Sequence, residues 1–290
     1  MPTEFFPKSV ELLRFLPEII LTLTGVLLMV LDGLGGRRWS GAYGNISLLG
    51  LAGALAAAVG ASSNPGPAFS GMLLADGFAA FFRALVIVVG ILTVLASYRF
   101  LAREGAETAE YHALILFSVT GQCVMVTANE LIMIFIGLEI SSIASYVLAG
   151  YLRDDKRNNE ASLKYFLLGS FATAFLLYGI AWIYGLTGST NLTTIHGVLA
   201  AHDMTPSPVL VGFSAALMFV GLGFKVSGAP FQIWAPDVYQ GAPTPVTAFL
   251  STGPKAATFA VLLRIVGTTE PASSVWVWAL WGLAVLSMFA

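Results

Sequence analysis

The sequence has few charged residues and almost no cysteine. Only 10% of its 290 residues are Asp, Glu, Lys or Arg, whereas 57% are hydrophobic. A water-soluble domain needs a surface of mixed charges, and this composition is too poor in charge to supply one. The single cysteine, Cys123, has no partner thiol, which excludes a disulfide framework or an iron-sulfur site built from this chain. We therefore expect an integral membrane protein in which Cys123 serves in packing.

The motifs of several other classes of protein are also missing. GLG at 221–223 lacks the third glycine of the dinucleotide-binding fingerprint, and no GxxxxGK[ST] phosphate loop occurs. The 14 Lys and Arg residues lie in small groups between apolar runs, without the basic face that binds nucleic acid. His112, His196 and His202 have no Cys or His companions at metal-ligand spacing. We expect this chain to bind no nucleotide, nucleic acid or metal.

Long hydrophobic runs dominate what is present. A membrane-spanning helix needs about 20 mostly apolar residues. Nine candidate runs occur, at 12–31, 44–61, 77–98, 112–128, 131–151, 162–186, 207–224, 244–266 and 275–290. The pattern predicts an all-α, polytopic transmembrane helix bundle. The last run stops at Ala290 without a polar flank, so we expect a fragment whose C-terminal half is missing.

Lys and Arg residues between the runs indicate the orientation, because short cytoplasmic loops are enriched in both. The first, third and fifth loops and their borders contain Arg37, Arg38, Arg99, Arg103, Arg153, Lys156, Arg157 and Lys164. The second, fourth and sixth loops contain none. Lys8 and Arg14 in the leading tail count against this assignment but are fewer. We predict a multi-pass protein whose N-terminus lies outside the cytoplasm.

The seventh run, 207–224, leads into a stretch rich in glycine and proline that continues to Tyr239. This stretch contains Gly221, Gly223, Gly228, Pro230 and Pro236. Glycine lowers helix stability, and proline removes a backbone donor. Irregular backbone at membrane depth survives only where protein or water satisfies its polar groups, and such breaks recur at transport sites. Two interpretations stay open, a broken transmembrane helix and an ordinary helix end followed by a surface loop.

Three ionisable residues have apolar neighbours on both sides. Glu139 lies near the middle of the fifth run, Lys225 lies at the break after the seventh, and Lys255 lies near the middle of the eighth. A charge at mid-bilayer costs about 2.5–3.5 kcal/mol, so each position needs a partner or a wet cavity. They are candidates for a functional intramembrane site. The alternative is a buried ion pair that only fixes helix packing, although such pairs are often no more stabilising than apolar replacements.

Hydroxyl groups recur at helical spacing around two of these charges. Ser142 and Tyr146 follow Glu139, and Ser251, Thr252 and Thr258 surround Lys255. We expect these hydroxyls to form an inward-facing polar seam that holds water beside the charges.

Three further ionisable residues lie nearer to the ends of predicted helices. Glu18 follows Pro17 in the first run, Asp76 opens the third run, and Arg83 lies one turn inside it. For all three we expect interfacial anchoring, in which the long side chain reaches the membrane surface.

Two blocks of sequence resemble one family of membrane proteins. The first is FKVSGAPFQIWAPDVYQGAPTPVTAFLSTGPKAATFA at 224–260. The second is ANELIMIFIGLEISSIASYVLAGY at 128–151, followed by EASLKYFLLGSFATAFLLYGIAWIYGLTGSTNL at 160–192. They resemble the antiporter-like membrane subunits of NADH-quinone oxidoreductase, respiratory complex I, and in particular subunit N. The resemblance covers about Glu110 to Arg264, and it extends loosely to the first three helices through PE at 17–18 and Asp76.

The resemblance implies a proton-translocating subunit that couples quinone reduction to proton transfer. It implies that Glu139, Lys225 and Lys255 form an intramembrane proton relay. It also implies three regions: N-terminal transmembrane helices at 1–105, a proton-translocating five-helix unit at 106–267, and the start of a truncated second, inverted unit at 268–290. Gln232 departs from the histidine that is common in the family's PFHxW motif, which puts a proton-relay role at that position in doubt.

The resemblance places the redox chemistry on other subunits. The complex uses NADH and quinone, with FMN and iron-sulfur clusters elsewhere, and no cofactor is expected on this chain. The implied partners are the other membrane and peripheral subunits and the lipid bilayer of the cell inner membrane. Two alternatives remain, a subunit of a multisubunit cation/proton antiporter and a passive membrane scaffold. The PDVYQGAP block favours the oxidoreductase.

The charge bias generates a topological prediction. A cysteine placed by Asn191→Cys is expected to react with an impermeant thiol reagent added outside intact cells, whereas one placed by Lys156→Cys is not. Labelling of both variants after disruption of the cells serves as the control. Labelling at position 156 but not at 191 in intact cells would reverse the predicted orientation.

Overall fold

A computed structural model describes residues 7–35, 40–201, 207–268 and 273–289 of the chain. The α-helices are α1 (Ser9–Arg14), α2 (Leu16–Gly35), α3 (Ser40–Ala61), α4 (Gly77–Glu104), α5 (Ala109–Thr127), α6 (Leu131–Ala149), α7 (Lys156–Thr187), α8 (Leu192–Ala200), α9 (Pro208–Val226), α10 (Ala235–Gly241), α11 (Thr244–Thr268) and α12 (Ser273–Phe289). A short 3-10 helix, η2 (Phe231–Trp234), precedes α10. The strands β1 (Gly66–Ala68) and β2 (Leu73–Ala75) form one antiparallel hairpin.

Every predicted apolar run coincides with a helix of the structure. Within the described ranges, eight segments are long and apolar enough to cross a membrane, and one of them runs from α9 through α10. The ninth run lies on α12, whose described apolar portion, Val277–Phe289, is shorter than a full crossing. The prediction of an all-α, polytopic bundle is confirmed, and the protein is a multi-pass membrane protein.

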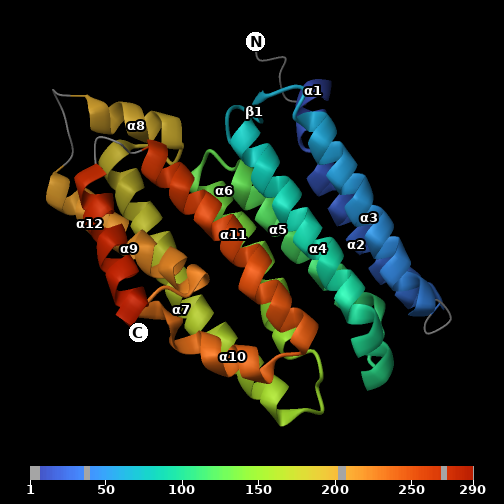
Figure 1. The fold of residues 1–290 in the computed structure, drawn as a ribbon. Coiled ribbons are helices and arrows are strands. Elements are labelled where there is room, and N and C mark those ends of the chain that lie inside the picture. The colour runs from blue at the N-terminus through green and yellow to red at the C-terminus, as the bar shows by residue number, and fades with distance from the viewer. Residues whose placement is uncertain (1–6, 36–39, 202–206, 269–272, 290) are drawn as a thin grey trace.

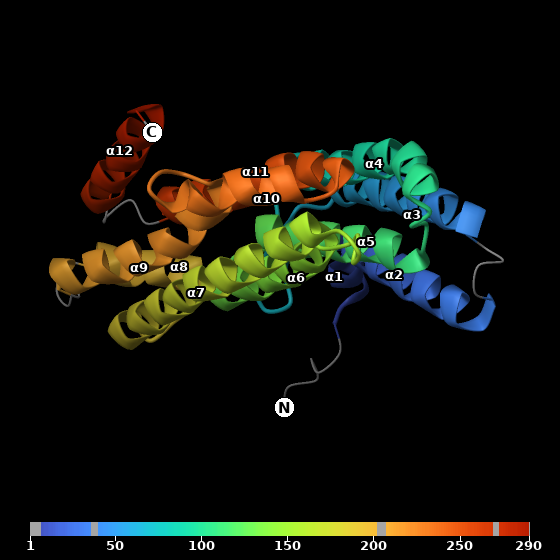
Figure 2. The same ribbon diagram turned by 90° about the horizontal axis from the view of Figure 1, so that it is seen from below.

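The helices run roughly alongside one another, with the N-terminal helices at one side of the bundle (Figure 1). There α2 and α3 pack together, and α7 and α9 form a second close pair at the opposite side. Between them lie α5, α6 and α11, and Figure 2 shows α12 set apart from α7 beyond α9 and α11. Glycine allows α5 and α6 to approach closely, because a Cβ on Gly121 would lie only 2.5 Å from the carbonyl oxygen of Gly137.

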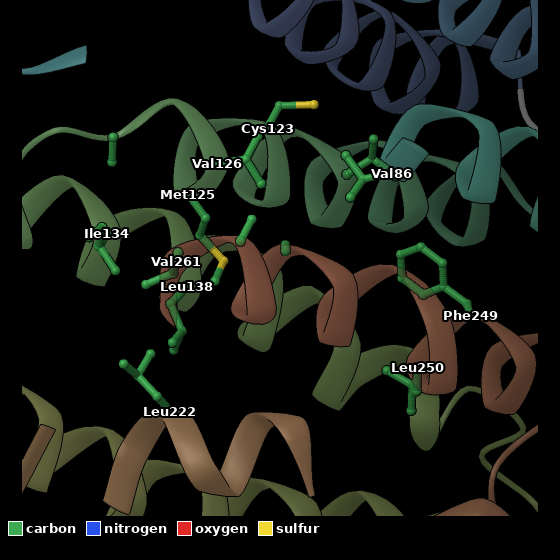
Figure 3. Packing of buried hydrophobic residues seen from close by; sticks show 14 of the residues in the cluster. Val86, Cys123, Met125, Val126, Ile134, Leu138, Leu222, Phe249, Leu250 and Val261 are labelled. Atoms are coloured by element: carbon green, nitrogen blue, oxygen red, sulfur yellow. The ribbon is translucent and has the colours of Figure 1, made fainter. Parts of the chain in front are cut away.

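Helix α11 packs against α4 and α5 on one side and against α9 on the other. In Figure 3, Val261 lies near Met125 of α5 and Leu138 of α6, with Leu222 of α9 below them. Cys123 points away from α11 and is fully buried among apolar side chains, as expected for a packing residue.

The second, fourth and sixth loops meet at one end of the bundle. The Asn129 and Asn191 side-chain amides each donate a hydrogen bond to the Gly71 carbonyl, at 3.1 Å in both cases. An isolated β-bridge also joins Glu130 to Asn191. This clustering agrees with the predicted alternation of loops between the two membrane faces. Of the basic residues used to orient the chain, Arg37 and Arg38 lie outside the described residues.

The interfacial role expected for Glu18 and Arg83 is wrong. Arg83 Nη2 lies 2.8 Å from Glu18 Oε1, and both side chains are buried, with exposures of 3% and 0%. Arg83 Nη1 also donates to the Arg14 carbonyl at 3.1 Å. The two charges lie on α2 and α4, which the fold brings together, so they neutralise each other inside the bundle and need no contact with the membrane surface.

Asp76 caps α4 and also binds α11. Its carboxylate accepts a hydrogen bond from the Ala79 amide at 2.7 Å and is contacted by both terminal nitrogens of Arg264, at 3.0 and 3.1 Å. Partial burial raises the pKa of Asp76, but the hydrogen bonds from Arg264 and Ala79 lower it more, so its pKa lies below the ordinary value. Asp76 opens its helix as predicted, and the two-pronged contact with Arg264 ties α11 to it.

The buried Glu18–Arg83 pair generates a stability prediction. Arg83→Met leaves the Glu18 carboxylate buried without its partner and is expected to destabilise the fold by about 3–5 kcal/mol. The double variant Glu18→Leu/Arg83→Met removes both charges and is expected to recover most of that loss. Unfolding of the purified protein in detergent measures both changes. The control is Arg103→Met, at an exposed arginine, and equal stability of Arg83→Met and this control would contradict the prediction.

Candidate functional site

The site is organised around the point where the seventh run breaks. Helix α9 ends at Val226, and Ser227 adopts a left-handed conformation with φ of 58°. The Gly228 amide donates to the Gly223 carbonyl at 3.0 Å, and the Ser227 amide donates to the Phe224 carbonyl at 3.1 Å. These two bonds form a Schellman cap, which satisfies carbonyls that a helix end leaves unpaired. Of the two interpretations of this stretch, the broken helix is confirmed.

Lys225 lies in the last turn of α9 and is 5% exposed. Its Nζ donates a hydrogen bond to the Tyr165 hydroxyl at 3.3 Å, and it lies 5.0 and 5.2 Å from the ring centres of Tyr165 and Tyr146. Aromatic faces and the carbonyl end of a helix both favour a positive charge. Tyr165 is nine residues after the start of α7, roughly 14 Å of helix rise, so the lysine lies well inside the bundle.

Glu139 lies at the middle of α6, eight residues after Leu131 and ten before Ala149. Its carboxylate forms no ion pair with Lys225, and Glu139 Oε1 has no hydrogen-bond partner among the described residues. At longer range the two opposite charges still attract each other. Tyr146 follows Glu139 by seven residues on the same helix, roughly 10 Å of rise, and its ring contacts Lys225. Among the described residues, the lysine is therefore held by tyrosines, with the carboxylate at longer range.

Lys255 lies near the middle of α11, and its Nζ is 5.3 Å from the ring centre of Tyr239 on α10. Pro254 precedes it inside the helix and supplies no amide hydrogen to the carbonyl of Leu250. A proline inside a helix removes one hydrogen bond of the helix ladder, and water is one of the groups that can take the place of the missing donor.

The polar seam expected around Lys255 is only partly present. Thr258 is buried, whereas the side chains of Ser251 and Thr252 are exposed. All three hydroxyls donate to backbone carbonyls of their own helix, Ser251 and Thr252 to Ala248 and Thr258 to Pro254. A hydroxyl on an apolar helix is readily satisfied in this way, so the expectation that Ser251 and Thr252 face inward is wrong. Beside Glu139, Ser142 and Tyr146 are both buried, as expected.

Three aromatic residues connect the two lysines, and we call them the aromatic bridge: Tyr165, Trp234 and Tyr239. The Tyr165 and Trp234 rings are stacked, with centres 4.5 Å apart and an interplanar angle of 11°. The Tyr239 ring meets Trp234 edge to face, with centres 5.7 Å apart. Trp234 Nε1 donates to the Phe224 carbonyl at 2.9 Å, which fixes the bridge to the broken end of α9.

Several buried polar atoms around the lysines have no partner in the described part of the chain. They are Glu139 Oε1, Tyr146 Oη, Gln232 Oε1 and Tyr239 Oη. Buried polar atoms are almost always hydrogen-bonded to protein or to ordered water. Four unpaired atoms in this region therefore favour bound water, which is the usual partner of such groups. One of the four atoms belongs to Gln232, at the position where the family commonly has histidine. Gln232 lies in η2, as does Trp234 of the bridge.

The sequence did not identify the aromatic bridge or a second polar cluster between α5 and α6. Gln122 Nε2 donates to Ser118 Oγ at 3.2 Å, and Ser118 Oγ lies 3.0 Å from Ser141 Oγ and 3.3 Å from Ser145 Oγ. The spacing of Ser118 and Gln122, and of Ser141 and Ser145, by four residues is a signal that places each pair on one helix face. Trp234 and Tyr239 occur in the sequence block at 224–260, but no pattern in the sequence assigned either residue to the site.

Among the described residues, no group of three or more His, Cys, Asp or Glu side chains is placed to hold a metal ion. His112 is buried at the start of α5. His202 lies outside the described residues.

A family model and the curated relatives of this chain point to the same family. The transmembrane family described as NADH:quinone oxidoreductase/Mrp antiporter matches residues 128–290. The chain is 67% identical over 279 residues to NADH-quinone oxidoreductase subunit N 1 of Solibacter usitatus, covering 96% of this chain and 57% of that protein. It thus spans little more than half the length of this curated relative.

Solved structures show the same fold. A chain of respiratory complex I from Thermus thermophilus with bound aureothin is 36% identical, with a TM-score of 0.74, and the match covers 86% of this chain and 53% of that one. A chain of the Mrp complex from Dietzia sp. DQ12-45-1b is 22% identical, with a TM-score of 0.76, covering 93% of this chain and 51% of that one, and shows the fold alone.

A polytopic helix bundle with a broken helix and ionisable side chains inside it is the arrangement of membrane proteins that translocate ions or protons. The chain belongs to the NADH:quinone oxidoreductase/Mrp antiporter transmembrane family. The resemblance to subunit N that the sequence motifs indicated is confirmed.

Proposed function

We propose that this chain is the proton-translocating part of an antiporter-like subunit of NADH-quinone oxidoreductase. Residues 106–267 form the translocating unit, and Glu139, Lys225 and Lys255 form its proton relay. The observation that carries the proposal is the position of Lys225, which is buried at the broken end of α9 between two tyrosine rings. The relatives named as subunit N support the assignment to the oxidoreductase.

The separation of Glu139 from Lys225 makes the relay adjustable. At an effective dielectric of about 20, a carboxylate and an ammonium attract each other by roughly 4 kcal/mol at about 4 Å and by roughly 2 kcal/mol at about 10 Å. A movement of α6 relative to the break in α9 therefore changes how strongly the carboxylate favours the charged lysine. Approach loads a proton onto Lys225, and separation releases it toward Lys255.

The driving energy comes from quinone reduction on other subunits. NADH and quinone are the substrates of the complex, FMN and the iron-sulfur clusters lie on those other subunits, and this chain carries the proton. Its partners are the remaining membrane and peripheral subunits, in the cell inner membrane, with the N-terminus outside the cytoplasm. The alternative is a subunit of a multisubunit cation/proton antiporter, and a chain of the Mrp complex has the same fold. The 67% identity to a subunit N favours the oxidoreductase.

Lys255 generates the first functional prediction. Lys255→Ala, in the full-length subunit of the assembled complex, is expected to lower proton pumping by about tenfold or more, because it removes the proton acceptor beyond Lys225. Quinone reductase turnover falls with it if the two processes are tightly coupled. The measurement is NADH-driven acidification of inside-out vesicles, with Lys156→Ala, an exposed lysine at the start of α7, as the control. Pumping at the control level by assembled Lys255→Ala would remove Lys255 from the relay.

Glu139 generates the second prediction. Glu139→Gln removes the charge that favours protonation of Lys225, so pumping is expected to fall strongly in a complex that still assembles. Glu139→Asp keeps the charge but shortens the side chain by one methylene, so partial pumping is expected. A passive ion pair predicts a different result, loss of assembly in Glu139→Gln, because a buried lysine is left uncompensated. Equal pumping by the wild type and both variants, at equal assembly, would rule out a switch at this position.

A further inference from the structure

In the relay proposed for Glu139, Lys225 and Lys255, no group has yet been named that carries the proton from Lys225 to Lys255. The two lysines lie on different helices, α9 and α11. Each ammonium lies against a different end of the aromatic bridge, Lys225 against Tyr165 and Lys255 against Tyr239. The contacts described above therefore lead from one amine to the other through the three rings of the bridge.

The two ends of the bridge carry hydroxyl groups, whereas its centre does not. Tyr165 Oη already accepts a hydrogen bond from Lys225 Nζ at 3.3 Å. Tyr239 Oη is buried without a protein partner among the described residues. The indole N–H of Trp234 is occupied by the Phe224 carbonyl, so Trp234 holds the rings in place and carries no proton.

We propose, on the basis of the function proposed above, that the hydroxyls of Tyr165 and Tyr239 carry the proton from Lys225 to Lys255 with water molecules between them. The Lys225 ammonium gives its proton to Tyr165 Oη as that hydroxyl releases its own proton to a bridging water. The same exchange at Tyr239 delivers a proton to the amine of Lys255. At the end both tyrosines are neutral again, Lys225 is an amine and Lys255 is an ammonium.

The surroundings of the bridge suit such a path. Gln232 Oε1 and Tyr146 Oη are also buried without a hydrogen-bond partner among the described residues, and the Tyr146 ring lies 4.7 Å from the ring of Tyr165. Such polar atoms need water as a partner. Pro254, next to Lys255, supplies no amide hydrogen to the carbonyl of Leu250. Water bound to these groups would continue the path on the α11 side, where a hydrogen-bonded chain is needed to reach the amine.

A tyrosine-to-phenylalanine series tests the carriers, because it removes one hydroxyl and keeps the ring. Tyr165→Phe and Tyr239→Phe are each expected to lower NADH-driven acidification of inside-out vesicles by about tenfold or more. The complex is expected to assemble normally in both variants, since each phenylalanine ring keeps the contact with Trp234. The matched control is Tyr184→Phe on the same helix as Tyr165, at a tyrosine that is 55% exposed.

The outcomes separate this proposal from the relay itself. Pumping at the level of Tyr184→Phe by either Tyr165→Phe or Tyr239→Phe would overturn the tyrosine path. Failure of either variant to assemble would also overturn it, because the hydroxyl would then be structural. If Lys255→Ala abolishes pumping in the same assay while both phenylalanine variants pump normally, the lysine relay stands and the tyrosine path is wrong. Normal pumping by Lys255→Ala removes the relay on which the path depends.

Discussion

Lys225 is buried with no contacting carboxylate in the described part of the chain, and the rest of the site depends on this constraint. An ammonium group inside a membrane protein is expensive unless its surroundings favour its charge. Here the protein uses three weaker contributions in place of a contact ion pair. They are the carbonyl end of α9, the faces of Tyr146 and Tyr165, and the field of Glu139 at longer range. Glu139 and Tyr146 lie on α6, Tyr165 lies on α7 and the carbonyl end belongs to α9, so the charge of Lys225 is sensitive to how these three helices are packed.

Close packing of α7 against α9 keeps the tyrosine beside the lysine. A Cβ on Gly179 would lie 2.8 Å from the Met218 amide nitrogen, and one on Gly221 would lie 2.9 Å from the Ala172 carbonyl oxygen. Without a hydrophobic driving force between helices, small residues at the contact allow the backbones to approach and gain dispersion energy. This approach places Tyr165 of α7 against Lys225 of α9, and the Schellman cap then directs the chain toward Trp234.

The features that sequence analysis predicted are those that depend on neighbours along the chain. Apolar length located the helices, glycine and proline located the break, and the cost of isolated charges singled out Glu139, Lys225 and Lys255. The features that it missed join residues far apart in sequence. Arg83 looked interfacial because its partner Glu18 is 65 positions away, and the bridge links Tyr165 to Trp234 across 69 positions. Such pairings follow from helix packing, which hydropathy and periodicity do not determine.

The two kinds of buried charge in this protein differ in a way that matters for function. Glu18 and Arg83 are in contact at 2.8 Å, so a small movement of either would break a strong interaction in a region of low dielectric. That pair resists movement and suits a structural role between α2 and α4. Lys225 has no such contact with Glu139, so the energy of its charged form changes gradually as the helices move. In the relay proposed above, Lys225 gains and loses a proton in each cycle. Such a group needs that gradual dependence, because a contact pair would hold the proton in place.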